Sequence, residues 1–201
     1  MTKIFFDLDG TLLDAKDRLY LLFQHLVPTS TLSFEEYWEL KKNRYTHRHI
    51  LKAKFSYSDE DVTSFEKNWL EKIELDEWLD LDRPFPGVKE HLAELKENHL
   101  LYVVTARQSK DRALKQLTKH RLINLFEEVF VTQHKQDKYD LIKAAVQTSY
   151  SDWLVGDTGN DIQTGKKLGI KTVAVLSGFM NKEKLLEYNP DLIIDNVLFF
   201  I

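Results

Sequence analysis

Near the start of the chain stands Ile4-Phe5-Phe6-Asp7-Leu8-Asp9-Gly10-Thr11, the stretch that decides the fold. Its first three residues form a short apolar run, which is typical of a buried strand, and two acids follow. Residues two apart on extended backbone point the same way, so Asp7 and Asp9 face one site while Leu8 turns away. Gly10 permits a tight turn directly afterwards. We therefore expect a strand that delivers two carboxylates to one edge of a sheet.

Five more short apolar runs follow along the chain, at residues 100–104, 129–131, 153–155, 172–176 and 192–194. Stretches with helical spacing separate them, such as the one that contains Val88, Leu92 and Leu95. Strands that alternate with helices predict an α/β fold with a doubly wound, Rossmann-like parallel sheet and helices on both faces.

The segment 15–83 interrupts this alternation, because it contains no convincing strand. Apolar residues recur there at helical spacing, first from Leu19 to Leu26 and again from Val62 to Ile73. Prolines and a glycine at 84–87 then mark the return to the sheet. We predict an all-α cap domain at residues 15–83, inserted into a core domain made of residues 1–14 and 84–201.

Composition narrows the classes of function. The chain has 28 Lys and Arg against 32 Asp and Glu, a net charge of −4, which disfavours a nucleic-acid partner. The absence of cysteine excludes disulfides, thiolate catalysis and cysteine-bound zinc. Neither a signal peptide nor a membrane-spanning run is recognisable, so we expect a cytoplasmic protein without a membrane partner. We expect a monomer or a weak homodimer.

Five polar residues follow three of the predicted strands at the point where each ends: Asp7, Asp9, Thr105, Asp157 and Asp161. In an open parallel sheet such strand ends meet at one edge. Clustered carboxylates repel one another and are stabilised together by a cation, and an all-oxygen set of ligands favours Mg²⁺. The combination suits phosphoryl transfer, which needs a nucleophile, a proton donor and charge neutralisation.

These motifs, in this order, resemble those of the haloacid dehalogenase (HAD) superfamily of aspartate-nucleophile phosphatases, and the resemblance covers essentially the whole chain. The stretch from Asp161 to Thr172, continuing to Gly178 and Phe179, looks like the phosphoglycolate-phosphatase-like branch with a small helical cap. The resemblance implies a Mg²⁺-dependent phosphohydrolase that acts on a small phosphorylated metabolite. It does not identify the substrate.

The resemblance also implies roles for the acids. Asp7 would form an aspartyl-phosphate, and Asp9 would protonate the leaving group and then activate water. Asp7, the backbone carbonyl of Asp9 and Asp157 would hold Mg²⁺. Asp161 would support the ion from nearby or through water.

By the same resemblance, Thr105, the amide of Ala106 and a lysine would bind the phosphoryl oxygens. Related phosphatases usually carry Lys-Pro before the relevant helix, whereas residues 134–140 read His-Lys-Gln-Asp-Lys-Tyr-Asp without a proline. Lys138 stands directly before the apolar residues of a predicted helix, so we prefer Lys138 to Lys135.

Three arginines are candidate substrate contacts. Arg107 follows Thr105 by two residues, and a guanidinium matches the geometry of phosphate or carboxylate, although an exposed loop charge explains it equally well. Arg44 and Arg48 lie in a basic stretch of the cap and either grip an anionic substrate or belong to a solvated helix face.

Three rival functions accompany the phosphohydrolase. A dehalogenase is disfavoured by Asp9, because cleavage of a carbon–halogen bond needs no acid to protonate an alcohol. A phosphomutase of the same fold stays open. A catalytically silent binding or regulatory homologue is the third, and loss of Asp7, Asp9 or Asp157 would be its mark, but all three are present.

Overall fold

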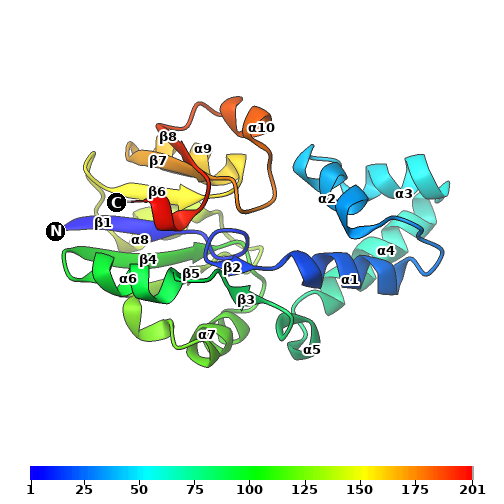
Figure 1. Cartoon of the computed structure of the whole chain (residues 1–201), viewed down its shortest axis with the longest axis horizontal. Helices are drawn as coiled ribbons and strands as arrows, with labels where there is room; N and C mark the ends of the chain where they lie inside the picture. The colour runs from blue at the N-terminus through cyan, green and yellow to red at the C-terminus, as the bar shows by residue number, and fades with distance from the viewer. Residues whose placement is uncertain (201) are drawn as a thin grey trace.

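A six-stranded parallel sheet forms the centre of the protein, seen in a computed structural model that describes residues 1–200 (Figure 1). The strand order is β5-β4-β1-β6-β7-β8. The strands are β1 (Thr2–Phe6), β4 (His99–Thr105), β5 (Glu128–Val131), β6 (Trp153–Gly156), β7 (Lys171–Val175) and β8 (Leu192–Ile194). Each of the six apolar runs lies in one of these strands, except that Leu176 follows the end of β7, so the predicted α/β fold is confirmed.

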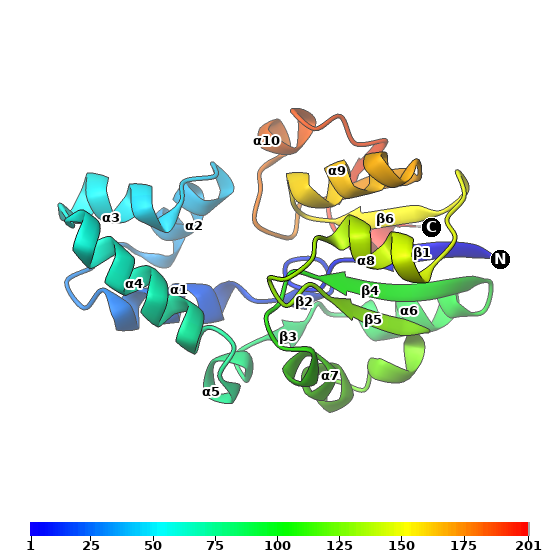
Figure 2. The same cartoon turned by 180° about the vertical axis from the view of Figure 1, so that it is seen from behind.

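Helices cover both faces of the sheet (Figures 1 and 2). They are α6 (Val88–Lys96), α7 (Lys110–Lys119), α8 (Lys138–Ala145), α9 (Gly159–Leu168) and the short α10 (Lys182–Leu186), with 3₁₀ turns η1 (Ile123–Leu125) and η2 (Val197–Phe199). In β1, Ile4 and Phe6 pack on the face that α6 and α7 cover, whereas Phe5 packs against α8. Because both faces are buried, the strand reads as a continuous apolar run.

β1 lies in the middle of the sheet and pairs with β4 on one side and with β6 on the other. Ligands of open α/β sheets bind outside the carboxyl ends of the strands, at the point where the direction of winding reverses. This edge of the sheet is where the acids of the sequence motifs were expected. Within residues 1–200, no helix is long and apolar enough to cross a membrane.

Five helices stand to one side of the sheet (Figure 2). They are α1 (Lys16–Leu26), α2 (Phe34–Lys42), α3 (His47–Phe55), α4 (Asp59–Lys72) and α5 (Asp76–Leu79). Their shared core is aromatic, with Phe23, Tyr37 and Phe65 buried together. Capping boxes at Ser33 and Ser58 begin α2 and α4, since each serine oxygen accepts from the third backbone amide of its helix.

A two-stranded antiparallel ribbon joins the helices to the sheet domain. It pairs β2 (Leu13–Asp14) with β3 (Arg83–Pro84). The sequence did not reveal these short strands, and Arg83, which we predicted within the helical segment, belongs to the ribbon. We keep the name cap for residues 15–83, and its boundaries stay a prediction.

Candidate active site

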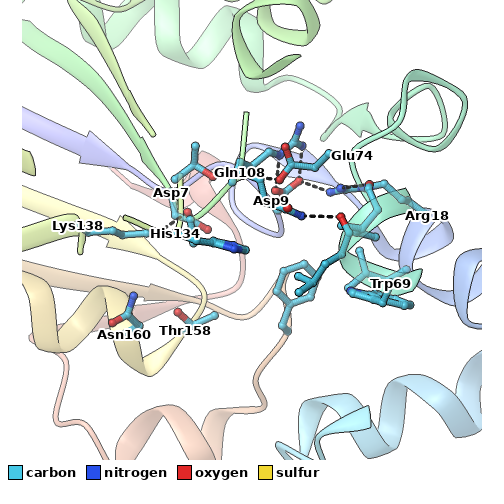
Figure 3. Close-up of a pocket in the computed structure, with 17 residues that line it drawn as sticks. Asp7, Asp9, Arg18, Trp69, Glu74, Gln108, His134, Lys138, Thr158 and Asn160 are labelled. Atoms are coloured by element: carbon cyan, nitrogen blue, oxygen red, sulfur yellow. Dashed lines mark hydrogen bonds and ion pairs between the residues drawn. The ribbon is translucent and has the colours of Figure 1, made fainter. Parts of the chain in front are cut away.

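The pocket at the carboxyl edge of the sheet is a cavity of about 310 Å³ between the sheet domain and the cap (Figure 3). Strand ends and the loops that follow them supply one wall, and α1, α4 and Glu74 supply the other. The lining residues are Asp7, Asp9, Arg18, Leu19, Trp69, Leu70, Ile73, Glu74, Thr105, Ala106, Arg107, Gln108, His134, Lys138, Thr158, Asn160 and Phe179.

Asp7 sits at the floor of this pocket, directly after β1. Its backbone N–H donates to the carbonyl of Val155 at 2.9 Å, so the sheet fixes its position. Lys138 Nζ donates to Asp7 Oδ1 and to Asp161 Oδ1, at 2.6 Å each. Lys138 is the first residue of α8, and Asp137 caps that helix by accepting from the amide of Asp140 at 2.7 Å. The helix start therefore aims the lysine at the carboxylates.

Lys135, the alternative lysine, is exposed and does not line the pocket, whereas the ammonium of Lys138 is buried against two acids. Burial alone would lower the pKa of Lys138, but Asp161 and Asp7 outweigh burial and raise it. The lysine is thus a permanent positive charge beside Asp7.

Asp157 and Asp161 complete a buried group of carboxylates with Asp7. One oxygen from each lies within 4.8 Å of the others. Asp161 Oδ2 accepts from the amide of Thr158 at 3.0 Å and from its hydroxyl at 2.6 Å, at the start of α9. Asp157 Oδ2 accepts from the amide of Phe179 at 2.7 Å. The other oxygens accept from Lys138 in Asp161 and from the Thr11 hydroxyl, at 3.5 Å, in Asp157, so both carboxylates are fixed.

Glycines give these carboxylates room. Gly10 has a φ of +84°, which an L-residue adopts only with strain, and a Cβ there would lie 2.6 Å from Asp157 Oδ2. A Cβ at Gly178 would lie 2.0 Å from the same oxygen. Any side chain at either position would displace Asp157, so both glycines are part of the site's construction.

The carboxylate group has the charge of a cation site. Three acids face a single lysine, which leaves an excess of negative charge in buried surroundings. Burial is the main cause that raises the pKa of Asp7 to about 6, and burial together with Asp7 and Asp161 raises the pKa of Asp157 well above its usual value. Oxygen ligands with excess negative charge fit a hard divalent cation such as Mg²⁺. The residues of the chain could therefore hold a metal here.

Asp9 points away from this group, although it lies only two residues from Asp7. Arg107 binds it through a fork, with Nε 2.7 Å from Asp9 Oδ2 and Nη2 2.6 Å from Asp9 Oδ1. Arg18 Nη2 donates to the same Oδ1 at 2.7 Å. Burial alone would raise the pKa of Asp9, but the charges of Arg107 and Arg18 outweigh burial and hold that pKa at about 2.

Asp82 is a second carboxylate that binds both arginines. It is fully buried and accepts from Arg18 Nε at 2.9 Å, from Arg107 Nη2 at 3.1 Å and from Gln116 Nε2 at 2.9 Å. We call Arg18, Arg107, Asp9 and Asp82 the arginine cluster. Its guanidinium groups and carboxylates pair directly with one another, and the nearby charge of Glu74 also acts on Arg107.

The structure brings the predicted residues of the core domain together but leaves two predicted cap residues outside. Thr105 ends β4 and lines the pocket with Ala106. Arg44 does not line the pocket; it pairs with Glu187 at 3.6 Å and lies over the ring of Tyr188.

Arg48 also lies outside the pocket lining, paired with Glu66 at 2.7 Å and Asp59 at 3.2 Å across α3 and α4. For this residue the solvated helix face was the better interpretation, because acids of the neighbouring helix satisfy its charge.

Arg18 is the arginine of the helical segment that reaches the pocket, and the sequence did not single it out. It lies beside the apolar stripe of α1, next to Leu19, and is only 3% exposed. A charged residue at the border of such a stripe is the signal that could have identified it. Asp82, Glu74 and His134 were missed as well, since each becomes notable only through its partners in the folded chain.

Comparison with known proteins gives a consistent result. Residues 4–175 match the profile of a family described as haloacid dehalogenase-like hydrolase. A Clostridium perfringens protein provisionally named pyrophosphatase PpaX is 30% identical over 97% of this chain and 93% of its own length. A phosphoglycolate phosphatase of Mesorhizobium japonicum is 28% identical over 96% of this chain and 90% of its own length.

A solved structure with the same fold is that of a haloacid dehalogenase-like hydrolase from Streptococcus pneumoniae. It has a TM-score of 0.74 and 23% identity, and the match covers 98% of this chain and 95% of the other. At that identity the likeness concerns the fold.

Proposed function

The chain belongs to the haloacid dehalogenase-like hydrolase family and is a phosphatase, and we propose that it hydrolyses small phosphorylated metabolites through an aspartyl-phosphate on Asp7. The observation that carries this proposal is the position of Asp7, buried between Lys138 and a group of acids that fits Mg²⁺, on the floor of a pocket. Mg²⁺ dependence and the roles below belong to the proposal.

In the first step an oxygen of Asp7 attacks phosphorus, and the bond from phosphorus to the leaving oxygen breaks. Lys138 holds the Asp7 carboxylate in place and neutralises charge beside it. Thr105 and the amide of Ala106 bind phosphoryl oxygens at the end of β4. Mg²⁺ held by Asp7, the backbone carbonyl of Asp9 and Asp157, with Asp161 in support from nearby or through water, would supply further charge neutralisation.

Asp9 carries a proton in both steps. In its acid form it donates a proton to the leaving oxygen, and as a carboxylate it takes a proton from the water that attacks the phosphorus of the aspartyl-phosphate. Phosphate leaves and Asp7 is restored. While both arginines hold Asp9, however, its carboxyl group is ionised at neutral pH and has no proton to give. The acid role therefore requires Asp9 to leave the arginine pair.

The proposal can be tested by phosphate release from a panel of phosphorylated metabolites, with Mg²⁺ and with a chelator. We expect Asp7→Asn to lower kcat by on the order of 10⁴-fold or more, because the nucleophile is lost. Asp17→Asn is the matched control, since Asp17 is exposed on α1 and does not line the pocket.

Release that is independent of Mg²⁺, or equal in Asp7→Asn and the parent protein when both are folded, would contradict the proposal. A phosphomutase would instead move phosphate between positions of one sugar phosphate without net release, and the same panel would show it.

A further inference from the structure

The arginine pair beside Asp9 has a hydrogen-bonding capacity that the chain does not use. Arg107 lines the pocket and is 3% exposed, yet its Nη1 is buried and has no hydrogen-bond partner among residues 1–200. Buried donors are normally satisfied, so an orphaned guanidinium nitrogen at a pocket points to a missing acceptor. Arg18 lines the same pocket and also binds the carbonyl of Ile73, at 3.1 Å from Nη1.

Asp9 is the exchangeable partner of this pair. Its side chain is 18% exposed and lines the pocket (Figure 3). Asp82 is 0% exposed and does not line the pocket. The fork of Arg107 on Asp9 is the arrangement that guanidinium groups form with any carboxylate or phosphate. Another oxyanion that enters the pocket can therefore take the same place.

Lost hydrogen bonds favour such an exchange. When Asp9 turns to a leaving group, Arg107 Nε and Arg18 Nη2 lose their acceptor, and a buried guanidinium nitrogen without an acceptor is costly. The charge of Glu74 acts on Arg107, but Glu74 does not replace the lost bonds, because its two oxygens accept from the amides of Gln108 and Ser109, at 2.6 and 3.0 Å, at the start of α7. An oxyanion supplied by the substrate restores these hydrogen bonds.

We propose that Arg18 and Arg107 bind a second anionic group of the substrate, which replaces Asp9 on the arginine pair and so frees Asp9 to reach the leaving oxygen. The inference rests on the proposed phosphatase function. Such a site favours small phosphate compounds with a second oxyanion close to the phosphoryl group. That oxyanion is either the other phosphate of a diphosphate or the carboxylate of a phosphorylated short acid, since both offer two oxygens to the fork.

The test compares substrates that differ in the second anion. Phosphoglycolate and ethyl phosphate share a two-carbon chain and differ in the carboxylate, and inorganic pyrophosphate represents the diphosphate source. We expect kcat/KM of the parent protein with Mg²⁺ to be at least about 10-fold higher for phosphoglycolate or pyrophosphate than for ethyl phosphate. Whichever of these two compounds is preferred identifies the source of the anion.

In Arg107→Gln the ratio of kcat/KM between the preferred compound and ethyl phosphate should fall by about 10- to 100-fold, because a charged hydrogen-bond fork is lost. Arg112→Gln is the matched control, since Arg112 lies in α7 outside the pocket lining. A merely structural role of Arg107 would lower the activity on all compounds alike and leave the ratio unchanged, which would overturn the inference.

Arg107→Lys guards against misfolding, because it keeps the charge opposite Asp82 while it removes the fork. Calorimetry provides a readout without turnover, with phosphonoacetate and ethylphosphonate as the probes. The parent protein should bind phosphonoacetate more tightly by about 10-fold or more, and Arg107→Lys should lose most of that preference. Equal affinity for the two probes in the parent protein would overturn the inference.

Failure of the inference is distinguishable from failure of the proposed function. If folded protein with Mg²⁺ hydrolyses ethyl phosphate with the same kcat/KM as phosphoglycolate and pyrophosphate, the proposed phosphatase function stands and the second-anion site is contradicted. If none of the compounds is hydrolysed, the phosphatase proposal fails for them, and the calorimetric preference still decides whether the arginine pair binds a second anion.

Discussion

Two acids that stand two residues apart, Asp7 and Asp9, have opposite surroundings. Asp7 belongs to a group of three carboxylates with one lysine, and its pKa is raised to about 6. Asp9 belongs to the arginine cluster, in which Arg107 and Arg18 bind its carboxylate and hold its pKa at about 2. The same residue type is thus destabilised as an anion in one place and stabilised in the other.

The difference in surrounding charge shows what each acid needs for its proposed role. The Asp7 group carries excess negative charge and is complete only with a cation, whereas the arginine cluster is complete until Asp9 leaves. Asp7, the proposed nucleophile, therefore needs a cation beside it. Asp9, the proposed proton carrier, needs to be released from its arginines. The following predictions alter one side of this contrast at a time.

After the loss of the nucleophile itself, the largest expected effect comes from Lys138, the only positive charge that contacts the Asp7 group within residues 1–200. Lys138→Met should lower kcat by about 10²- to 10³-fold, because the phosphoryl group loses a fixed charge in a buried site. Steady-state kinetics with saturating Mg²⁺ measure it. Lys135→Met, three residues away and exposed, should retain activity within about twofold. Equal losses in the two variants would contradict the assignment.

A smaller effect is expected on thermal stability when Mg²⁺ binds the acids. At a free concentration of about 100 times Kd, Mg²⁺ should add about 2.7 kcal/mol to the free energy of unfolding and raise Tm by roughly 5 to 10 °C. Asp157→Asn should lose most of that shift. In a chelator it should melt at or above the parent temperature, because burial and the neighbouring Asp7 and Asp161 disfavour the anion of Asp157, and the neutral amide avoids that cost.

Asp140→Asn, at an exposed acid of α8, should keep the full shift and serves as the control in the same calorimetric scans. A Mg²⁺-induced shift in Asp157→Asn as large as in the parent protein would mean that the ion binds elsewhere.

The smallest effect concerns pH without metal. The folded protein keeps a proton on Asp7 up to about pH 6, whereas an unfolded chain releases it near 3.8. The stability that Asp7 contributes is therefore complete below about pH 3.8 and is lost as pH rises through 6, a change of at most about 3 kcal/mol. Asp157 acts in the same direction. Urea unfolding in a chelator should show higher stability at pH 5 than at pH 7.

Asp9 does not disturb this window, since its pKa is lowered and its contribution is lost only as pH falls towards 2. Asp7→Asn should weaken the dependence between pH 5 and 7 without abolishing it, because burial also raises the pKa of Asp82 to about 6 and that of Asp157 well above its usual value. If the metal-free parent protein is less stable at pH 5 than at pH 7, the raised pKa of Asp7 is contradicted.

The sheet and the Asp7 group could be predicted from sequence because short-range patterns encode them. Buried parallel strands read as apolar runs, and the residue after each run lies at the functional edge. Asp7, Thr105 and Asp157 followed directly from that rule. A phosphate-binding lysine was implied by the family resemblance, and the position at a helix start favoured Lys138 over Lys135.

The arginine cluster could be predicted only in part. Asp9 and Arg107 were candidates, but their contacts with Arg18 and Asp82 join distant segments. Arg18 comes from α1, Arg107 from the loop after β4, and Asp82 from the residue before β3. Each looks locally like an ordinary surface charge, and only the folded chain buries them together. The basic stretch around Arg44 and Arg48 gave a stronger local signal, yet acids nearby satisfy both charges.

The division of labour between Asp7 and Asp9 is tested most directly by trapping the phosphorylated enzyme. In Asp9→Asn with p-nitrophenyl phosphate and Mg²⁺, the leaving group needs no proton, so the first step proceeds while hydrolysis of the aspartyl-phosphate is slowed. Rapid acid quench and peptide mass spectrometry should find phosphate on Asp7, after a burst of nitrophenol that approaches one equivalent per chain. A burst without phosphate on Asp7, or phosphate on another residue, would contradict the account.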